Sequence, residues 1–265
     1  MNVIDLSQPF AIADLLVNDI YYFVLVFTRL GTVFMLMPGI SNSAVPARVR
    51  LAAALTVAAV VTPLVYQLLP PFPDDFATLM LIILIEFMTG LIFGMIARFF
   101  ITAADVAGSI IGLQIGMANA LLFNPVTAVQ GSLTALFITL VAILVMFATG
   151  LHYLLIAAAV DSYAWLPAGV VPDTSDTAQL ISQTLSNSFS VGVRMATPIL
   201  VLMTVFHIAV GILTRLMPQA MIFFVALPLQ IFLGWLITAV TLTAALDLWF
   251  NHAESILGTF VQSAF

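Results

Sequence analysis

Long apolar runs separated by short polar breaks form the main pattern along this chain. A helix needs about 20 apolar residues to cross the hydrocarbon core of a bilayer, and six runs are of about this length or longer. They cover residues 20–37, 51–69, 79–100, 132–160, 189–213 and 220–249. We therefore predict an all-α, polytopic membrane protein with about six apolar helical segments, forming a single membrane domain over residues 1–265.

The breaks between these runs are rich in proline, glycine and acidic residues. Pro38 and Gly39 end the first run, prolines and aspartates fill residues 70–75, and a polar stretch covers residues 161–188. Such residues punctuate helices because they favour turns or remove a backbone donor. We expect them to lie in the loops between helices.

The segment 101–124 differs from the other apolar segments because it carries Gly108, Gly112 and Gly116 at intervals of four. In one interpretation these glycines form a seam where two helix backbones pack closely. In the other, three glycines, each costing a helix about 1 kcal/mol relative to alanine, favour a broken or mobile backbone. A non-helical backbone at membrane depth is tolerated where it lines a cavity, which would place this segment at a pore.

Composition strengthens the membrane assignment and excludes several functions. Hydrophobic residues make up 63% of the chain and charged residues only 7%, against about a quarter charged in soluble domains. Lysine is absent, so phosphate-loop and Schiff-base lysine chemistry is excluded. A net charge of −6 argues against a nucleic-acid partner, and the lack of cysteine excludes disulfides and thiolate metal sites.

Arginine positions predict the orientation, because cytoplasmic loops retain basic residues. In a six-segment arrangement, Arg48, Arg50, Arg98 and Arg215 all fall on one side. We expect these arginines, with Pro218 and Gln219, to mark cytoplasmic-side turns. Both termini are then expected on the non-cytoplasmic side.

Arg29 and Glu86 are charged residues inside apolar runs. An unpaired charge at that depth costs at least about 2.5 kcal/mol, so we expect the two residues to form a structural intramembrane pair. The alternative is a proton or ion relay, which usually needs a chain of titratable groups.

Catalytic and cofactor motifs are missing from the sequence. His152, His207 and His252 are too far apart for a helical metal pair, and neither HExxH nor GxSxG occurs. We expect no enzyme activity, no metal and no cofactor.

Motifs in a consistent order along nearly the whole chain resemble one known family. The residues that carry the resemblance are Arg29, Pro38, Pro46-Ala47-Arg48-Val49-Arg50, Glu86, Gly90, Gly94, Gly108, Gly112-Leu113-Gln114-Ile115-Gly116, Asn124-Pro125, Arg215-Leu216-Met217-Pro218-Gln219, Phe223, Pro228 and Gly234. The chain resembles the FliR family of flagellar type III export-gate subunits, which is related to the T subunits of injectisomes.

The resemblance implies a subunit that forms, with FliP and FliQ, a conduit for unfolded flagellar proteins across the bacterial inner membrane at the flagellar basal body. It places FlhB and FlhA nearby and the membrane lipid around the complex. It also implies that apolar hairpins can be covered by other subunits rather than by lipid. A plug segment would comprise Gly108, Gly112, Leu113, Gln114, Ile115, Gly116 and Met117.

Three other functions fit part of this pattern. An injectisome gate subunit fits the same motifs. A small-solute secondary transporter would explain the glycine-rich segment as a midplane binding site, but it predicts an internal repeat, and no second copy of the 108–116 glycine pattern occurs. An intramembrane enzyme lacks a catalytic constellation.

Overall fold

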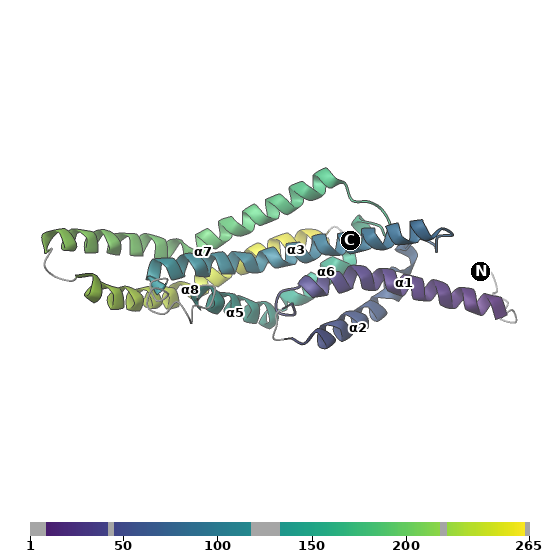
Figure 1. Ribbon diagram of the computed structural model, residues 1–265, viewed down its shortest axis with the longest axis horizontal. Helices are drawn as coiled ribbons and strands as arrows, with labels where there is room; N and C mark the ends of the chain where they lie inside the picture. Colours follow the sequence, from purple (N-terminus) through teal and green to yellow (C-terminus); the bar gives the residue numbers. More distant parts are fainter. Residues whose placement is uncertain (1–8, 42–44, 118–132, 218–221, 263–265) are drawn as a thin grey trace. The chain divides into compact units, whose positions relative to one another are not determined.

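The computed structural model describes residues 9–41, 45–117, 133–217 and 222–262, and nearly all of these lie in helices (Figure 1). The helices are α1 (Pro9–Leu36), α2 (Ala47–Val65), the short 3₁₀ helix η1 (Tyr66–Leu68), α3 (Phe76–Ile115), α5 (Leu133–Ala148), α6 (Leu151–Trp165), α7 (Thr174–Leu216) and α8 (Ile222–Gln262). Strands are absent from the described residues.

The helices have the length and composition of membrane spans. Five of them are long and apolar enough to cross a bilayer, and α5 with α6 makes a sixth candidate if the pair counts as one broken span. The prediction of an all-α polytopic membrane protein is therefore confirmed.

Helix α3 joins two segments that the sequence analysis separates, residues 79–100 and 101–124. It runs unbroken for 40 residues, from Phe76 to Ile115. The glycines do not interrupt it because a small residue lets a neighbouring helix approach closely, and this packing offsets the low helix propensity. Asp75 stabilises the start of α3 by accepting a hydrogen bond from the Thr78 amide at 3.3 Å.

Two other helix boundaries differ from the sequence prediction. The run predicted over residues 132–160 is divided into α5 and α6 at Gly150, which has a φ of 80°. Glycine is favoured at helix ends with a positive φ because it has no Cβ atom. Helix α7 begins at Thr174, well before the expected residue 189. There the Asp173 carboxylate accepts a 2.8 Å hydrogen bond from the Ser175 amide, so a side-chain cap starts the helix inside a polar stretch.

The chain divides into two compact units. The first comprises residues 1–98, 152–182 and 257–265, and the second comprises residues 99–151 and 183–256. The prediction of one domain over residues 1–265 stays a prediction.

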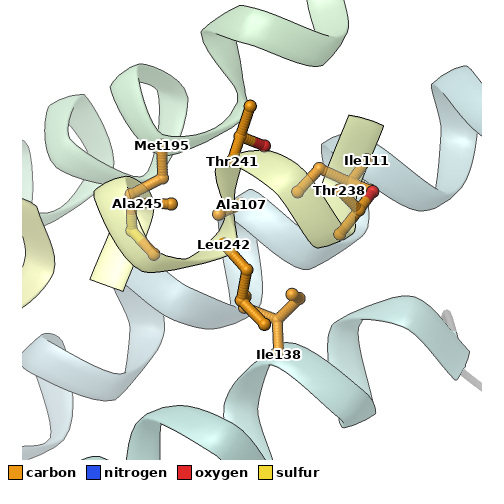
Figure 2. Close-up of a pocket in the computed structure, with 8 residues that line it drawn as sticks. All are labelled: Ala107, Ile111, Ile138, Met195, Thr238, Thr241, Leu242 and Ala245. Atoms are coloured by element: carbon orange, nitrogen blue, oxygen red, sulfur yellow. The ribbon is translucent and has the colours of Figure 1, made fainter. Parts of the chain in front are cut away.

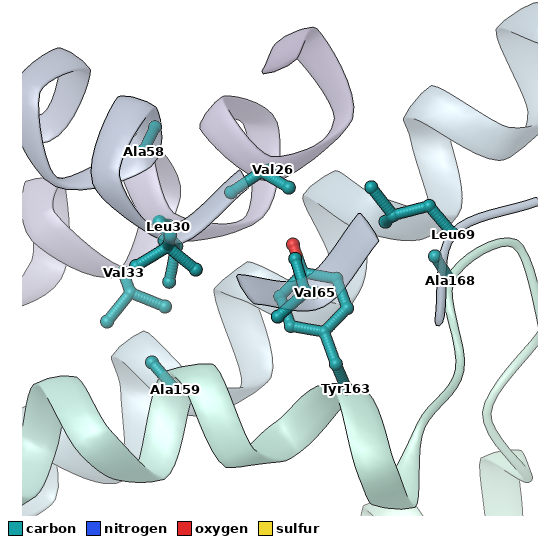
Figure 3. Close-up of a cluster of buried hydrophobic side chains, with 10 residues drawn as sticks. Val26, Leu30, Val33, Ala58, Val65, Leu69, Ala159, Tyr163 and Ala168 are labelled. Atoms are coloured by element: carbon teal, nitrogen blue, oxygen red, sulfur yellow. The ribbon is translucent and has the colours of Figure 1, made fainter. Parts of the chain in front are cut away.

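In the first unit, α1, α2 and α6 meet in a cluster of buried apolar side chains (Figure 3). Val26, Leu30 and Val33 of α1 face Ala58 and Val65 of α2, and Ala159 and Tyr163 of α6 also belong to the cluster. Helix α3 packs against α1 through two glycines. A Cβ atom on Gly90 would lie 2.5 Å from the Arg29 carbonyl oxygen, and one on Gly94 would lie 2.6 Å from Leu36, so both positions require glycine.

In the second unit, the end of α3 packs against α7. Ile111 and Ile115 contact Ala196, Ile199 and Met203. A cavity of about 10 Å³ lies close by, where side chains of α3, α5, α7 and α8 converge (Figure 2). A volume this small holds at most about one water molecule, so the cavity is not a solute site.

Candidate functional site

Arg29 of α1 and Glu86 of α3 form a buried ion pair. The Arg29 Nε donates to Glu86 Oε2 at 2.8 Å, and Nη2 donates to Glu86 Oε1 at 2.9 Å. The residues are 1% and 0% exposed. Two parallel bonds between a guanidinium and a carboxylate are the strongest geometry available to such a pair. Arg29 and Glu86, which we predict from the sequence to form a pair, are thus in contact.

Helix α6 and the turn after it supply the remaining partners of this pair. The Arg29 Nη1 donates to Ser162 Oγ at 3.1 Å, and Nη2 also donates to the Leu166 carbonyl at 3.0 Å. The Gly169 amide donates to Glu86 Oε1 at 3.2 Å, from a backbone with a φ of 78° that favours glycine. The ion pair therefore connects α1, α3 and α6.

An aromatic ring covers one face of the guanidinium. The Arg29 Cζ atom lies 3.9 Å from the centre of the Tyr163 ring, within the range of a cation–π contact. The Tyr163 side chain is fully buried, and its hydroxyl has no hydrogen-bond partner among the described residues. The ring rather than the hydroxyl is thus the part of Tyr163 that serves the ion pair.

The sequence pattern does not predict the other partners of Arg29 and Glu86, which are Ser162, Tyr163, Leu166 and Gly169. Ser162 and Tyr163 belong to the polar break after residue 160, which was expected to be a loop, whereas α6 continues to Trp165. Leu166 and Gly169 contribute backbone groups, which leave no signature in side-chain chemistry. The polar Ser162 beside an apolar run was the one signal available.

The glycine-rich segment is helical up to Ile115, and all three of its glycines are buried. A Cβ atom on Gly108 would lie 2.4 Å from the Ala135 Cα atom of α5. Gly108 is therefore a packing position, as in the first of the two interpretations of this segment. Leu113 is 66% exposed, so one face of the segment is open.

Helix α3 ends at a glycine in the left-handed region. Gly116 has a φ of 84°, and its amide donates to the Leu113 carbonyl at 3.1 Å. The next residue, Met117, accepts a hydrogen bond through Sδ from the Thr134 hydroxyl at 3.3 Å. The backbone thus changes direction inside the expected plug segment, directly after the helical part.

Helix α8 contacts this helix end. The Gln230 side-chain amide donates to the Gln114 carbonyl at 2.8 Å. A Cβ atom on Gly234 would lie 2.3 Å from Cγ1 of Ile115, and Ile115 is completely buried. Of the expected plug residues, Ile115 and Gln114 are therefore held by α8, whereas Leu113 faces outward.

The arginines expected at cytoplasmic-side turns are at or near the protein surface. Arg48, Arg98 and Arg215 are exposed, and Arg50 is half-buried. The prediction of a turn at Arg98 is wrong, because this residue lies inside α3, which continues to Ile115. Arg50 donates a long hydrogen bond of 3.4 Å to the Ser41 carbonyl. Pro218 and Gln219 lie outside the described residues.

A larger groove of about 460 Å³ lies between α1 and α3 of the first unit. It is lined by Phe27, Thr28, Gly31, Thr32, Met35, Leu36, Phe87 and Leu91. The two threonine hydroxyls donate to carbonyls of their own helix, so the groove presents a mostly apolar wall. Within the described ranges, no group of three His, Asp or Glu side chains is placed to hold a metal ion.

Comparison with known proteins relates the chain to bacterial export proteins. The sequence pattern of "Bacterial export proteins, family 1" matches residues 20–256. The flagellar biosynthetic protein FliR of Caulobacter vibrioides is 38% identical over 91% of this chain and 96% of its own length. FliR of Bacillus subtilis is 29% identical over 83% of this chain and 86% of its own.

A relative that is not named FliR is similar over a comparable share of the chain. The Yop proteins translocation protein T of Yersinia pestis is 28% identical over 83% of this chain and 85% of its own length. The similarity therefore extends over most of the chain and includes both units.

Proposed function

The chain belongs to the bacterial export proteins, family 1, and from this membership we propose that it is a subunit of the flagellar type III protein export gate. The resemblance to the FliR family is thereby confirmed. The observation that carries the proposal is the 38% identity to a FliR protein over nearly the full length of both chains. An apolar, charge-poor helical protein suits such a role, because it works by packing and gating within a membrane assembly.

The finer proposal is that the chain forms, with FliP and FliQ, the conduit for unfolded flagellar proteins across the inner membrane, with FlhB and FlhA nearby. The lengths of the helices support a role inside an assembly. Helices α3 and α8 have 40 and 41 residues, about 60 Å at 1.5 Å per residue, whereas the hydrocarbon core is about 30 Å thick. Apolar helix surface beyond that thickness needs cover from other subunits.

In this proposal the segment from Gly108 to Met117 acts as the plug of the conduit. The segment carries no charged side chain, which suits a pore that must pass unfolded chains of varied sequence without binding them tightly. Its last residues follow the end of α3 at Gly116, where a glycine permits a change of direction. Leu113 presents an exposed apolar side chain next to this point.

The ion pair between Arg29 and Glu86 has a structural role in this proposal. Both carboxylate oxygens of Glu86 accept hydrogen bonds from Arg29, and Oε1 accepts a further one from Gly169. This saturation favours fixed packing of α1, α3 and α6 over a relay, which would have to exchange protons. We further propose that the protein has no catalytic activity and draws its driving energy from elsewhere.

The orientation proposed from the arginines places both termini on the non-cytoplasmic side. The positions of Arg48 in the first turn of α2 and Arg215 in the last turn of α7 support it, because basic residues next to the ends of membrane spans are retained in the cytoplasm.

An injectisome gate subunit is the second candidate, favoured by the similarity to the Yersinia protein. Two assays in a strain lacking the chain separate these functions. A flagellar subunit restores filament assembly and co-purifies in mild detergent with FliP and FliQ, whereas an injectisome subunit restores effector secretion without filaments. A small-solute transporter purifies alone and restores neither, and that result would reject the proposal.

A further inference from the structure

The C-terminal end of α3 receives a hydrogen bond from a side chain of another helix. The last four carbonyls of an α-helix have no partner within the helix, and in apolar surroundings each unpaired carbonyl is costly. Gln114 provides one of these carbonyls, and the Gln230 side-chain amide of α8 donates to it at 2.8 Å. Gln230 thus caps α3 from outside.

A steric fit lies one turn further along α8. A Cβ atom on Gly234 would lie 2.3 Å from Cγ1 of Ile115 and 3.1 Å from its Cβ. The missing side chain leaves room for Ile115, which is completely buried beside Ile199 and Met203 of α7. Gln230 and Gly234 therefore hold two consecutive residues, Gln114 and Ile115, immediately before the turn at Gly116.

We propose that Gln230 and Gly234 form a latch that positions the end of α3 in the closed gate and that opens during export. This inference rests on the proposed function of the segment as a plug. The latch consists of one neutral hydrogen bond and one apolar contact, so its release is far less costly than separation of the buried Arg29–Glu86 pair. Beyond the latch, Met117 is held by a weak sulfur acceptor bond, and Gly116 turns without strain.

Replacing Gln230 tests the hydrogen bond. Gln230→Leu keeps a side chain of similar size and removes the donor. Loss of one typical hydrogen bond shifts a closed–open equilibrium about fivefold, so we expect about a fivefold rise in resting permeability to a small dye per assembled complex. Thr241→Val is the control, since its hydroxyl donates at 2.9 Å to the Ile237 carbonyl of the same helix and contacts neither Gln230 nor Gly234 through this bond. If assembled Gln230→Leu complexes are no more permeable to the dye than wild-type complexes, the latch proposal is wrong.

A cross-link tests the opening step without depending on that variant. The chain contains no cysteine, so the double variant Ile115→Cys with Gly234→Cys introduces a unique pair. Their Cβ atoms would start 3.1 Å apart, close to the roughly 3.5–4.5 Å found in disulfides. After oxidation, completeness is checked by protection of both thiols from a maleimide reagent.

We expect the oxidised complex to lose most of its export and to regain it on reduction, while the Ile115→Cys single variant, which leaves Gly234 unchanged, is insensitive to oxidant. If fully cross-linked complexes export at the wild-type rate, the proposal is wrong, because the latch then need not open during export. All assays use a strain that lacks this subunit, and the wild-type chain is tested there first, because the proposed function predicts that it restores export. Failure of the wild-type chain would count against the proposed function, whereas failure confined to these variants concerns the latch alone.

Discussion

The indole nitrogen of Trp249 donates a 2.7 Å hydrogen bond to the carbonyl oxygen of Phe100, although the two residues are 149 positions apart. Trp249 is 1% exposed. Together with the bond from Gln230 to Gln114, this contact ties α8 to α3 at two points. Helix α8 thus holds α3 through side-chain donors that reach main-chain oxygens.

We expect Trp249→Phe to destabilise the protein by about 1–3 kcal/mol, because it removes the donor and part of a buried ring. Trp249→Ala should cost about 3–5 kcal/mol. The measurement is thermal denaturation of the purified complex. Trp165, which is 50% exposed, provides the control, and a Trp165→Phe variant as unstable as Trp249→Phe would contradict the argument.

Arg29 and Glu86 should behave as a coupled pair. Each single change to alanine leaves a buried charge unpaired and should cost about 3–5 kcal/mol, whereas the double variant should cost clearly less than the sum. The amount of assembled complex in the membrane reports the effect. Strictly additive losses would show that the two residues act independently.

Exchanging the two charges should not rescue assembly. Ser162 Oγ, the Leu166 carbonyl and the Tyr163 ring suit a guanidinium on α1, and the Gly169 amide suits a carboxylate on α3. The variant Arg29→Glu with Glu86→Arg should therefore accumulate less than the double alanine variant. Assembly at the wild-type level would mean that only the charge pair matters.

Tyr163 should tolerate loss of its hydroxyl but not of its ring. Within the part of the chain that the structure describes, the hydroxyl is buried without a partner, so Tyr163→Phe removes an unsatisfied group and should leave stability unchanged or raise it by about 1 kcal/mol. Tyr163→Leu loses the cation–π contact with Arg29 and should lower stability by about 1–2 kcal/mol or more. Denaturation of the two variants in parallel gives the order, and a reversed order would reject this role for the ring.

Substitution by alanine should have opposite effects on stability at two glycines, Gly108 and Gly211. Gly108→Ala would place a methyl group 2.4 Å from the Ala135 backbone and should cost at least about 1–3 kcal/mol through overpacking. Gly211→Ala meets no atom within 4 Å and should add up to about 1 kcal/mol of helix propensity. Complex yield and denaturation temperature should move in opposite directions for the two variants. Equal effects would show that the seam at Gly108 is not tightly packed.

Sequence alone predicts the helical class and the pairing of intramembrane charges because the bilayer imposes both. A charge in hydrocarbon requires a partner, and few polar residues were available to Arg29. The rest of the site depends on tertiary contacts. The Leu166 carbonyl and the Gly169 amide are backbone groups present at every residue, so only the path of the turn selects them. The continuity of α3 through Gly108 depends on packing against Ala135 of another helix. Helix propensity describes single residues and cannot predict such a contact.

The buried ion pair also sets an order of events while the chain is being made. Arg29 precedes Glu86 by 57 positions and Ser162 by 133. At about 5–20 residues per second, ribosomes deliver the glutamate roughly 3–11 s after the arginine, and the serine later still. During this interval the nascent α1 carries a cation with no protein acceptor. Insertion of α1 before α3 is made therefore carries the cost of an unpaired charge, at least about 2.5 kcal/mol, and pairing with Glu86 removes that cost.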